Sequence, residues 1–282
     1  MLIILFALIA AAAAVGICWA AGAFASLMWL WLLPLCFVVV YILCAAITFG
    51  LLVLICQTSD PDKPREKDNK AFRAFAIWCV EIALFFLPIR IHTKGLEKRP
   101  KDGRFLLVCN HLHEVDPAVL IYYFRRTPMA FVAKRETKNM FLVDKALPML
   151  LCPLINREND REALKTILRC IHLLKEDVVS IGVFPEGYIH KKRKLHHFRP
   201  GVFKIAQKAK VPIVVCTLQN TQYAIKNSLK LKRTDIHMHV LDVIPAEAVL
   251  EKSTTELAEQ IYQMMAQDLG PENVLTPEEE NA

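Results

Sequence analysis

Two histidines and an aspartate follow a short, largely apolar run that is typical of a buried strand. The run covers residues 104–109 and continues into Asn110-His111-Leu112-His113-Glu114-Val115-Asp116-Pro117. Polar groups at the carboxyl end of a buried strand lie where α/β proteins usually place their sites. A carboxylate beside an imidazole fixes its tautomer and makes it a better base. His111 and Asp116 are therefore candidates for a pair that removes the proton from a substrate hydroxyl.

The same segment has two other interpretations. Pro117 suits the first turn of a helix, which would make Asp116 a simple N-cap and leave the histidines as ordinary loop residues. A His-x-His pair, here His111 and His113, also often binds zinc. The known metallohydrolase pattern has Asp and then His at the fourth and fifth positions after the first histidine, where this chain has Val115 and Asp116. No second clear ligand cluster follows, so we expect no metal.

A second apolar run, residues 178–184, ends in Pro185-Glu186-Gly187. A carboxylate next to a glycine can accept hydrogen bonds from a polyol while the backbone approaches closely. The simpler interpretation is a Pro-Gly turn with an exposed glutamate. The motif alone leaves both interpretations open.

The elements that must position these groups alternate between strands and helices. Continuous Val/Ile/Leu-rich runs predict strands that are buried on both faces. The predicted strands are 104–109, 130–133, 154–156, 178–184, 213–218 and 236–243. The predicted helices between and after them are 117–124, 139–150, 160–175, 202–208 and 251–269. This alternation predicts an α/β fold over residues 90–270, with a mixed, mainly parallel sheet flanked by helices.

The N-terminal part contains no Asp, Glu, Lys, Arg or His before Asp60. A helix needs about 20 apolar residues to span a bilayer, so there is room for two, near residues 2–21 and 28–52. We expect residues 1–57 to form a hydrophobic helical hairpin that anchors the chain by spanning or re-entering a membrane. A cleaved signal peptide is the alternative for the first segment, but no basic stretch precedes it.

The next segments extend this expected organisation. Residues 58–89 predict a polar linker and an amphipathic helix over 71–87, which either lies on the membrane surface or covers the sheet. The linker region is basic, and the positive-inside rule therefore puts the catalytic domain on the cytoplasmic side of the cell membrane. Residues 271–282 are rich in Pro and Glu and predict a disordered tail. The basic residues to which the positive-inside rule applies are Lys63, Arg65, Lys67, Lys70 and Arg73.

The formal net charge of the chain is +7, and all of it lies after the apolar N-terminal part. Such a charge suits an anionic partner, for example lipid headgroups, the phosphates of CoA or an acidic carrier protein. Nucleic acid would fit the charge but not the membrane segment. We therefore expect a membrane lipid partner and no nucleic acid.

Taken together, the motifs resemble the glycerolipid acyltransferase family that includes the 1-acyl-glycerol-3-phosphate acyltransferases. The N-H-x4-D motif of that family is matched by Asn110, His111 and Asp116, and F-P-E-G by Phe184, Pro185, Glu186 and Gly187. A strand ending in arginine is matched at Arg157, V-P-I-V at Val211, Pro212, Ile213 and Val214, and a weaker K-x-E element at Lys134 and Glu136. The motifs occur in the family's order between about residues 90 and 218.

The resemblance implies transfer of a fatty acyl group from acyl-CoA or an acyl-carrier protein to the 2-hydroxyl of lysophosphatidic acid, giving phosphatidic acid, with no cofactor. It also implies that His111 is the general base and Asp116 its orienting partner. Arg157 would bind the acceptor phosphate through paired hydrogen bonds. The implied substrate-binding residues are Arg157, Glu186, Gly187 and Lys134.

One departure concerns the acceptor. The family motif usually continues T-R-S after F-P-E-G, whereas this chain has Tyr188-Ile189-His190 and so lacks an arginine expected at the phosphate. The basic residues 191–194 follow at once, as a substitute for that arginine or as a solvated loop. Glycerol-3-phosphate, another lysophospholipid or a glycolipid therefore stay open as acceptors. A non-catalytic lipid-binding protein is the alternative from a different functional class.

Overall fold

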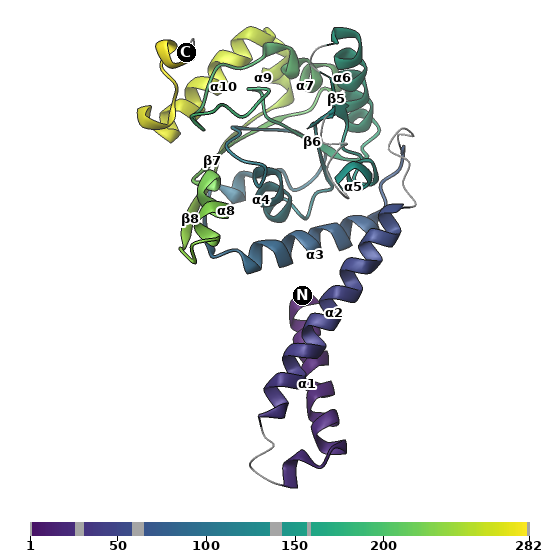
Figure 1. The fold of residues 1–282 in the computed structure, drawn as a ribbon. Helices are drawn as coiled ribbons and strands as arrows, with labels where there is room; N and C mark the ends of the chain where they lie inside the picture. The colour runs from purple at the N-terminus through teal and green to yellow at the C-terminus, as the bar shows by residue number, and fades with distance from the viewer. Residues whose placement is uncertain (1, 26–30, 58–64, 136–142, 157–158, 281–282) are drawn as a thin grey trace. The chain divides into compact units, whose positions relative to one another are not determined.

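The computed structural model describes residues 2–25, 31–57, 65–135, 143–156 and 159–280 (Figure 1). It divides the chain into two compact units, Met1–Asp60 and Pro61–Ala282. The described elements of the first unit are all helical, and every described strand lies in the second unit.

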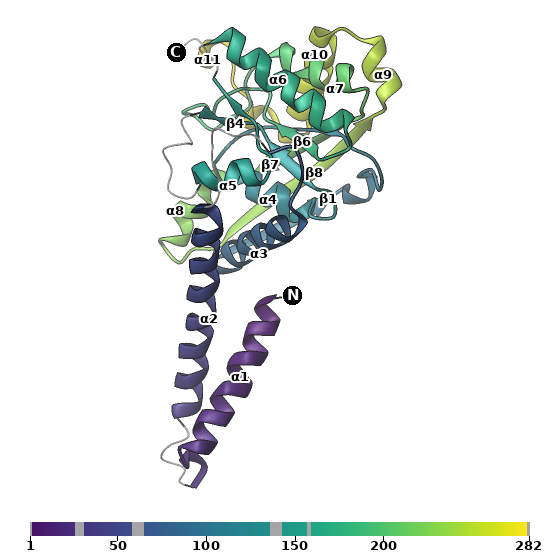
Figure 2. The same ribbon diagram turned by 90° about the vertical axis from the view of Figure 1, so that its right-hand side faces the viewer.

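The first unit is a pair of apolar helices, α1 (Leu2–Ala20) and α2 (Leu32–Gln57), with a 3-10 turn, η1 (Ala23–Ala25), between them (Figure 2). Ala10, Ala14 and Cys18 recur every four residues along α1 and are buried, and such small side chains let two helices approach closely. Within the described residues, α2 is long and apolar enough to cross a bilayer, whereas the apolar stretch of α1 is shorter. The predicted hairpin of hydrophobic helices is thus confirmed as part of the fold.

The second unit is built on a six-stranded sheet in the order β1-β8-β7-β2-β6-β3. All neighbouring strands run parallel except β7 and β8, which are antiparallel. A second, two-stranded parallel sheet pairs β4 with β5. The strands are β1 (Ile89–Lys94), β2 (Leu106–Cys109), β3 (Met129–Phe131), β4 (Ala133–Lys134), β5 (Leu154–Ile155), β6 (Ser180–Val183), β7 (Ile213–Gln219) and β8 (Thr234–Ile244). The predicted mixed, mainly parallel sheet is confirmed.

Helices cover both faces of the six-stranded sheet (Figure 1). Leu106 and Val108 of β2 pack with α6 (Asp160–Lys175), α7 (Lys204–Ala209), α9 (Ala246–Glu251) and α10 (Thr254–Leu269). Leu107 and Cys109 pack on the other face with α3 (Lys70–Phe86), α4 (Asp116–Tyr123) and α8 (Ala224–Ser228). The remaining described helices are α5 (Val143–Met149), α11 (Pro277–Glu280), η3 (Leu96–Lys98), η5 (Pro200–Phe203), η6 (Thr221–Tyr223) and η7 (Pro271–Asn273). Both faces of β2 are therefore shielded from water, which explains its continuous apolar sequence.

Helix α3 covers the sheet, one of the two positions expected for it. Its Leu84 belongs to the apolar core, and Asn69 caps its first turn by accepting a hydrogen bond from the Phe72 amide. The buried Arg73 donates to the carbonyl oxygen of Leu150, 3.0 Å away, and pairs with Asp68. Phe85 and Phe86 stay exposed on the outer side, so contact of that side with a membrane remains a prediction.

Several elements differ from the sequence-based expectations, among them α8 and α9, neither of which was predicted as a helix. β1 was not predicted, because apolar and polar residues alternate along it instead of forming a continuous apolar run. It lies at the edge of the sheet and pairs with β8 alone. The predicted strand 130–133 divides into β3 and β4. The predicted helix 251–269 begins at Thr254, where a capping box between Ser253 and Glu256 starts α10. The expected disordered tail instead pairs with Leu195 through Val274 and continues into α11. The predicted helix 139–150 lies partly outside the described residues.

Two glycines with left-handed backbones allow a controlled test of the packing of β1 on β8. Gly95 (φ 75°) and Gly103 (φ 76°) would both be strained by a side chain. A Cβ atom on Gly95 would lie 2.1 Å from the carbonyl oxygen of Val240 on β8, whereas one on Gly103 would meet nothing within 4 Å. We expect Gly95→Ala to lower the free energy of unfolding by about 1–3 kcal/mol more than Gly103→Ala does, because only the first overpacks the sheet. Denaturant unfolding of the full chain in detergent measures this, and equal losses would contradict it.

Candidate active site

The register of two parallel strands brings the two predicted motifs together. Val108 of β2 lies opposite Val183 of β6, so both strands end at the same edge of the sheet. The residues that follow each strand therefore run side by side, although they are about 75 positions apart in the sequence. The backbone amide of His111 donates to Glu186 Oε2 at 2.8 Å, which joins the two loops directly.

His111 and Asp116 form the pair that the sequence predicts. Nδ1 of His111 lies 2.8 Å from Oδ2 of Asp116, and the aspartate is fully buried. The same oxygen accepts the backbone amides of Leu112 at 2.7 Å and His113 at 2.8 Å. The imidazole is only partly covered, with 18% of its side chain exposed. The loop after β2 thus wraps around a single carboxylate oxygen and leaves the His111 ring partly accessible.

The alternative in which Asp116 is only a helix N-cap does not describe this geometry. Asp116 is the first residue of α4, and Val115 occupies the N-cap position without a side-chain hydrogen bond. The carboxylate faces back to the loop, because the amides that it accepts precede the helix. The expectation of an Asp116 N-cap is therefore wrong in detail, and the carboxylate serves the imidazole and the loop.

Asn110 continues the pairing of β2 with β7 through its side chain. Its Nδ2 donates to the carbonyl oxygen of Leu218 at 2.9 Å, and its Oδ1 accepts the Leu218 amide at 2.8 Å. The side-chain amide of Asn110 takes the place of one further backbone residue in the hydrogen bonding of β2 with β7. The backbone is therefore free to turn toward α4 after Cys109. The sequence motif contained Asn110 but gave no indication of this partner.

An aromatic ring stacks on one face of the imidazole. Phe184, directly after β6, stacks on His111 with ring centroids 4.0 Å apart and an interplanar angle of 14°. The ring of Phe131 on β3 in turn stacks on Phe184, with ring centroids 5.8 Å apart. Gly182 makes this arrangement fit, since a Cβ there would lie 2.3 Å from the Phe131 ring. The phenylalanine of the F-P-E-G motif thus fixes the plane of the histidine.

Gly187 turns the chain directly after Glu186, at a point where the side chain of Arg199 lies close to the backbone. Its φ of 86° is in the left-handed region, and a Cβ would lie 2.8 Å from Arg199 Nε. The Arg199 amide also donates to the carbonyl oxygen of Pro185 at 2.8 Å. Arg199 is not among the residues predicted from the sequence, because it follows the motif by twelve residues and nothing in that spacing marks it.

Glu186 is a buried acid at the base of the site. Burial raises its pKa well above the usual range, and the charge of the nearby Asp116 adds to the rise. Hydrogen bonds from the backbone of His111 and His196 act in the opposite direction. The turn with an exposed glutamate, the simpler interpretation of Pro185-Glu186-Gly187, does not describe this residue, whose exposed fraction is zero.

The basic cluster at 191–194 is divided between two partners. Lys192 and Lys194 both pair with Glu279, at 3.2 Å and 3.5 Å. Arg193 turns the other way, and its Nη1 donates to the carbonyl oxygen of Leu112 at 2.8 Å. Arg193 is therefore the member of the cluster that reaches the loop carrying His111.

The other predicted site residues lie on neighbouring elements. Lys134 ends β4, where it is opposite Ile155 of β5. Pro212 leads into β7, and its carbonyl oxygen accepts the Leu106 amide at 3.0 Å. Arg157 and Glu136 fall outside the described residues, so the phosphate contact expected of Arg157 stays a prediction.

Comparison with known proteins matches this part of the chain. A family model described as Acyltransferase covers residues 90–219, from the second residue of β1 to the last residue of β7. The chain is 29% identical over 192 residues to a 1-acyl-sn-glycerol-3-phosphate acyltransferase of Borreliella burgdorferi, which is 66% of this chain and 76% of that protein. It is 30% identical over 173 residues to a probable 1-acyl-sn-glycerol-3-phosphate acyltransferase of Mycoplasma genitalium, which is 60% of this chain and 62% of that protein.

A solved structure has the same fold. The crystal structure of the 1-acyl-sn-glycerophosphate acyltransferase PlsC from Thermotoga maritima superposes with a TM-score of 0.62 at 20% identity, over 81% of this chain and 91% of that one. The matched region contains both loops of the candidate site, and together these matches define an acyltransferase domain. Residues 90–219 therefore resemble an acyltransferase domain, and the two relatives bear the name of 1-acyl-sn-glycerol-3-phosphate acyltransferases.

The burial of Glu186 predicts a pH dependence of stability. Its folded pKa lies above the unfolded value near 4.5, so between these two values the folded state binds more protons than the unfolded state. The free energy of unfolding contributed by this group therefore falls as the pH rises through that window. Glu186→Gln cannot ionise, and we expect its free energy of unfolding to rise relative to the wild type as the pH increases above 4.5. Denaturant titrations of the full chain at several pH values measure the difference.

Glu162 provides a control of opposite sign. Hydrogen bonds from Asn156 and Arg135 lower the pKa of its carboxyl, so its contribution to stability is present above the unfolded value near 4.5 and is lost as the pH falls through the folded value. Glu162→Gln should therefore lose stability relative to the wild type as the pH rises through the window below 4.5. A Glu186→Gln difference that follows the same direction as Glu162→Gln would refute the assignment.

Proposed function

We propose that the chain transfers a fatty acyl group from an acyl thioester to the 2-hydroxyl of 1-acyl-glycerol-3-phosphate and so produces phosphatidic acid. The observation that carries the proposal is the hydrogen-bonded pair of His111 and Asp116 at the end of β2, in a chain whose relatives bear the name of that activity. We further infer that the reaction takes place at the cytoplasmic side of a membrane, which the apolar α2 and the basic residues after it support.

The pair accounts for the proton movements of the reaction. Asp116 accepts the Nδ1 hydrogen of His111, so the lone pair on Nε2 takes the proton of the acceptor hydroxyl. The hydroxyl oxygen forms a bond to the thioester carbonyl carbon, and the resulting tetrahedral intermediate collapses by breaking the carbon–sulfur bond. The thiolate leaving group then receives the proton from the imidazolium.

The acyl group passes directly from donor to acceptor in this mechanism. Cys109 is the thiol nearest to the motif, and it is fully buried between the sheet and α4. Burial raises the pKa of its thiol well above the usual value, which disfavours the thiolate that a covalent intermediate would need. No protein nucleophile is therefore part of the proposal.

The phosphate of the acceptor requires basic groups at the mouth of the site. We infer that Arg193 supplies the contact that the missing T-R-S arginine would otherwise make, because its guanidinium already donates to the Leu112 carbonyl beside His111. A guanidinium has further donors in the same plane, which suits a phosphate. Arg157 stays a second candidate.

Replacing the proposed base gives the central test. We expect His111→Ala to lower the turnover of lysophosphatidate in membranes by about 10²–10⁴-fold, which is the usual contribution of a general base. His92→Ala is the matched control, because His92 lies on β1 in an exposed pair with Asp235. Wild-type turnover in His111→Ala would refute the proposed base, and equal turnover with every acceptor tried would refute the choice of lysophosphatidate.

The role of Arg193 is separable from that of the base. We expect Arg193→Ala to raise the KM for lysophosphatidate by about 10–100-fold, because a hydrogen bond to a charged group contributes about 1.5–3 kcal/mol. Lys191→Ala, a neighbour on the same exposed loop, should leave KM within about twofold, since exposed charge contacts contribute little. Steady-state kinetics against a series of acceptor concentrations measures both. A fall in kcat at unchanged KM would show that Arg193 only holds the loop, and would contradict phosphate binding.

A further inference from the structure

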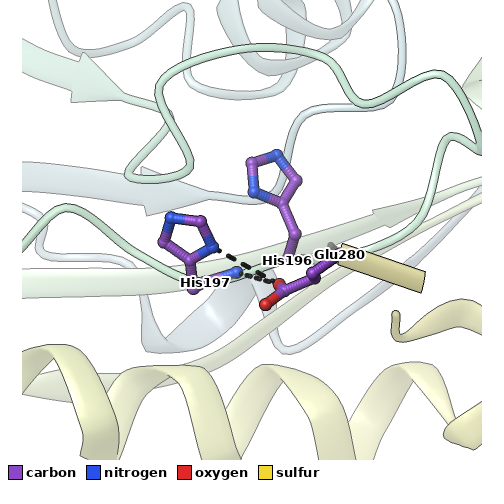
Figure 3. Close-up of side chains that lie close together, drawn as sticks. All are labelled: His196, His197 and Glu280. Carbon is purple, nitrogen blue, oxygen red and sulfur yellow. Dashed lines mark hydrogen bonds and ion pairs between the residues drawn. The ribbon is translucent and has the colours of Figure 1, made fainter. Parts of the chain in front are cut away.

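Three metal-binding side chains converge outside the site described above, and they come from two distant parts of the chain. His196 and His197 lie on the loop before η5, and Glu280 is the last residue of α11 (Figure 3). One ligand atom from each lies within 4.8 Å of those of the other two. Figure 3 shows the two imidazole rings and the carboxylate facing a common space.

A hydrogen bond from Nε2 of His196 fixes the tautomer of its ring and leaves Nδ1 available as a metal ligand. Its Nε2 lies 3.1 Å from the carbonyl oxygen of Tyr188, which can only accept, so Nε2 carries the hydrogen. The lone pair is therefore on Nδ1, which is buried and has no hydrogen-bond partner among the described residues. A buried nitrogen without a partner is costly, and a carbonyl that fixes the tautomer is the usual outer partner of a metal-bound histidine.

The other two side chains are held in place but can adjust. The backbone amide of His197 donates to Glu280 Oε1 at 2.8 Å, and its ring Nδ1 lies 3.5 Å from the same oxygen. Bonds of 2.0–2.1 Å around a tetrahedral zinc ion put ligand atoms about 3.3 Å apart, so the cluster, whose ligand atoms lie within 4.8 Å of one another, needs to contract by up to about 1.5 Å. His197 is exposed and Glu280 is partly exposed, which leaves them free to rotate inward.

Two of the cationic side chains near the cluster are neutralised by a carboxylate. The two lysines nearest in sequence, Lys192 and Lys194, are both paired with the neighbouring carboxylate Glu279. Thr276 and Glu279 also close the first turn of α11 by exchanging hydrogen bonds.

We propose that His196, His197 and Glu280 bind a divalent first-row transition metal ion such as Zn²⁺, with water in the remaining position. Two imidazoles and one carboxylate form a donor set that suits zinc and related ions, and does not suit Mg²⁺ or Ca²⁺, which prefer oxygen ligands alone. The sequence-based expectation of no metal rested on the segment around His111, and this cluster lies elsewhere in the chain.

The bound ion would fasten the C-terminal segment to the loop that carries the F-P-E-G motif. Leu195 already pairs with this segment, since its amide donates to the Asn273 carbonyl at 2.8 Å and its carbonyl accepts the Leu275 amide at 2.9 Å. The metal therefore serves as a structural clamp on the loop, and it takes no part in the acyl transfer itself.

The test measures binding and does not depend on enzymatic activity. Chelator-treated full-length chain in detergent is titrated with Zn²⁺ in competition with a chromophoric chelator, and the midpoint of thermal unfolding is followed with and without the ion. We expect His197→Ala and Glu280→Gln, neither of which is in the buried core, to weaken the strongest site by at least about tenfold, because the loss even of outer partners costs about 10–100-fold. Glu278→Gln, an exposed position two residues away on α11, is the matched control and should bind as the wild type does.

Cobalt distinguishes this site from the cysteines of the chain. Co²⁺ bound to the three residues should give weak visible bands of nitrogen and oxygen ligation that disappear in Glu280→Gln. Unchanged Zn²⁺ affinity in both His197→Ala and Glu280→Gln, or a thiolate-to-cobalt charge-transfer band in place of the expected bands, would overturn the proposal. Failure of this test would leave the role of His111 untouched, because the acylation assay does not depend on the metal.

Discussion

One oxygen of a buried carboxylate organises the loop on which the chemistry depends. Asp116 Oδ2 accepts three hydrogen bonds, from the His111 ring and from the amides of Leu112 and His113. A buried carboxylate is costly, and these three bonds to Oδ2 offset part of that cost by curling the loop after β2 around it, whereas Oδ1 has no hydrogen-bond partner among the described residues. The same interaction fixes the histidine tautomer. Folding of the loop and preparation of the base are therefore a single event, and a change that loosens one will disturb the other.

The loop is also tied to the strands on both sides of β2. Asn110 continues the ladder toward β7 through Leu218, and Glu186 receives the His111 amide from the side of β6. These ties explain why two motifs far apart in sequence carry an asparagine and a glutamate next to the residues with chemical roles. Phe184 adds a stacked ring, so His111 is restrained in position by hydrogen bonds and in orientation by an aromatic contact.

The sequence could predict the sheet because strands buried on both faces are continuous apolar runs, as in β2, β6 and β7. It could predict that His111 and Asp116 follow such a strand, but not that Asp116 faces back to the loop, since capping and loop-binding aspartates have the same spacing. β1 was missed because an edge strand alternates in character. Contacts such as Arg193 with Leu112 or His197 with Glu280 join residues about 80 positions apart, and periodicity contains no information on them.

The segment between β6 and η5 connects the chemistry to the end of the chain. Glu186 holds its beginning against His111, while Leu195 is paired with Val274 near its end. Arg193 lies between these fixed points with a left-handed backbone (φ 54°), so its guanidinium is presented to the Leu112 carbonyl by a loop restrained at both ends. It follows that a perturbation of the C-terminal segment should first affect groups on this loop, such as Arg193. The pair of His111 and Asp116 would be affected less, because the hydrogen bonds to Asp116 all come from the loop after β2.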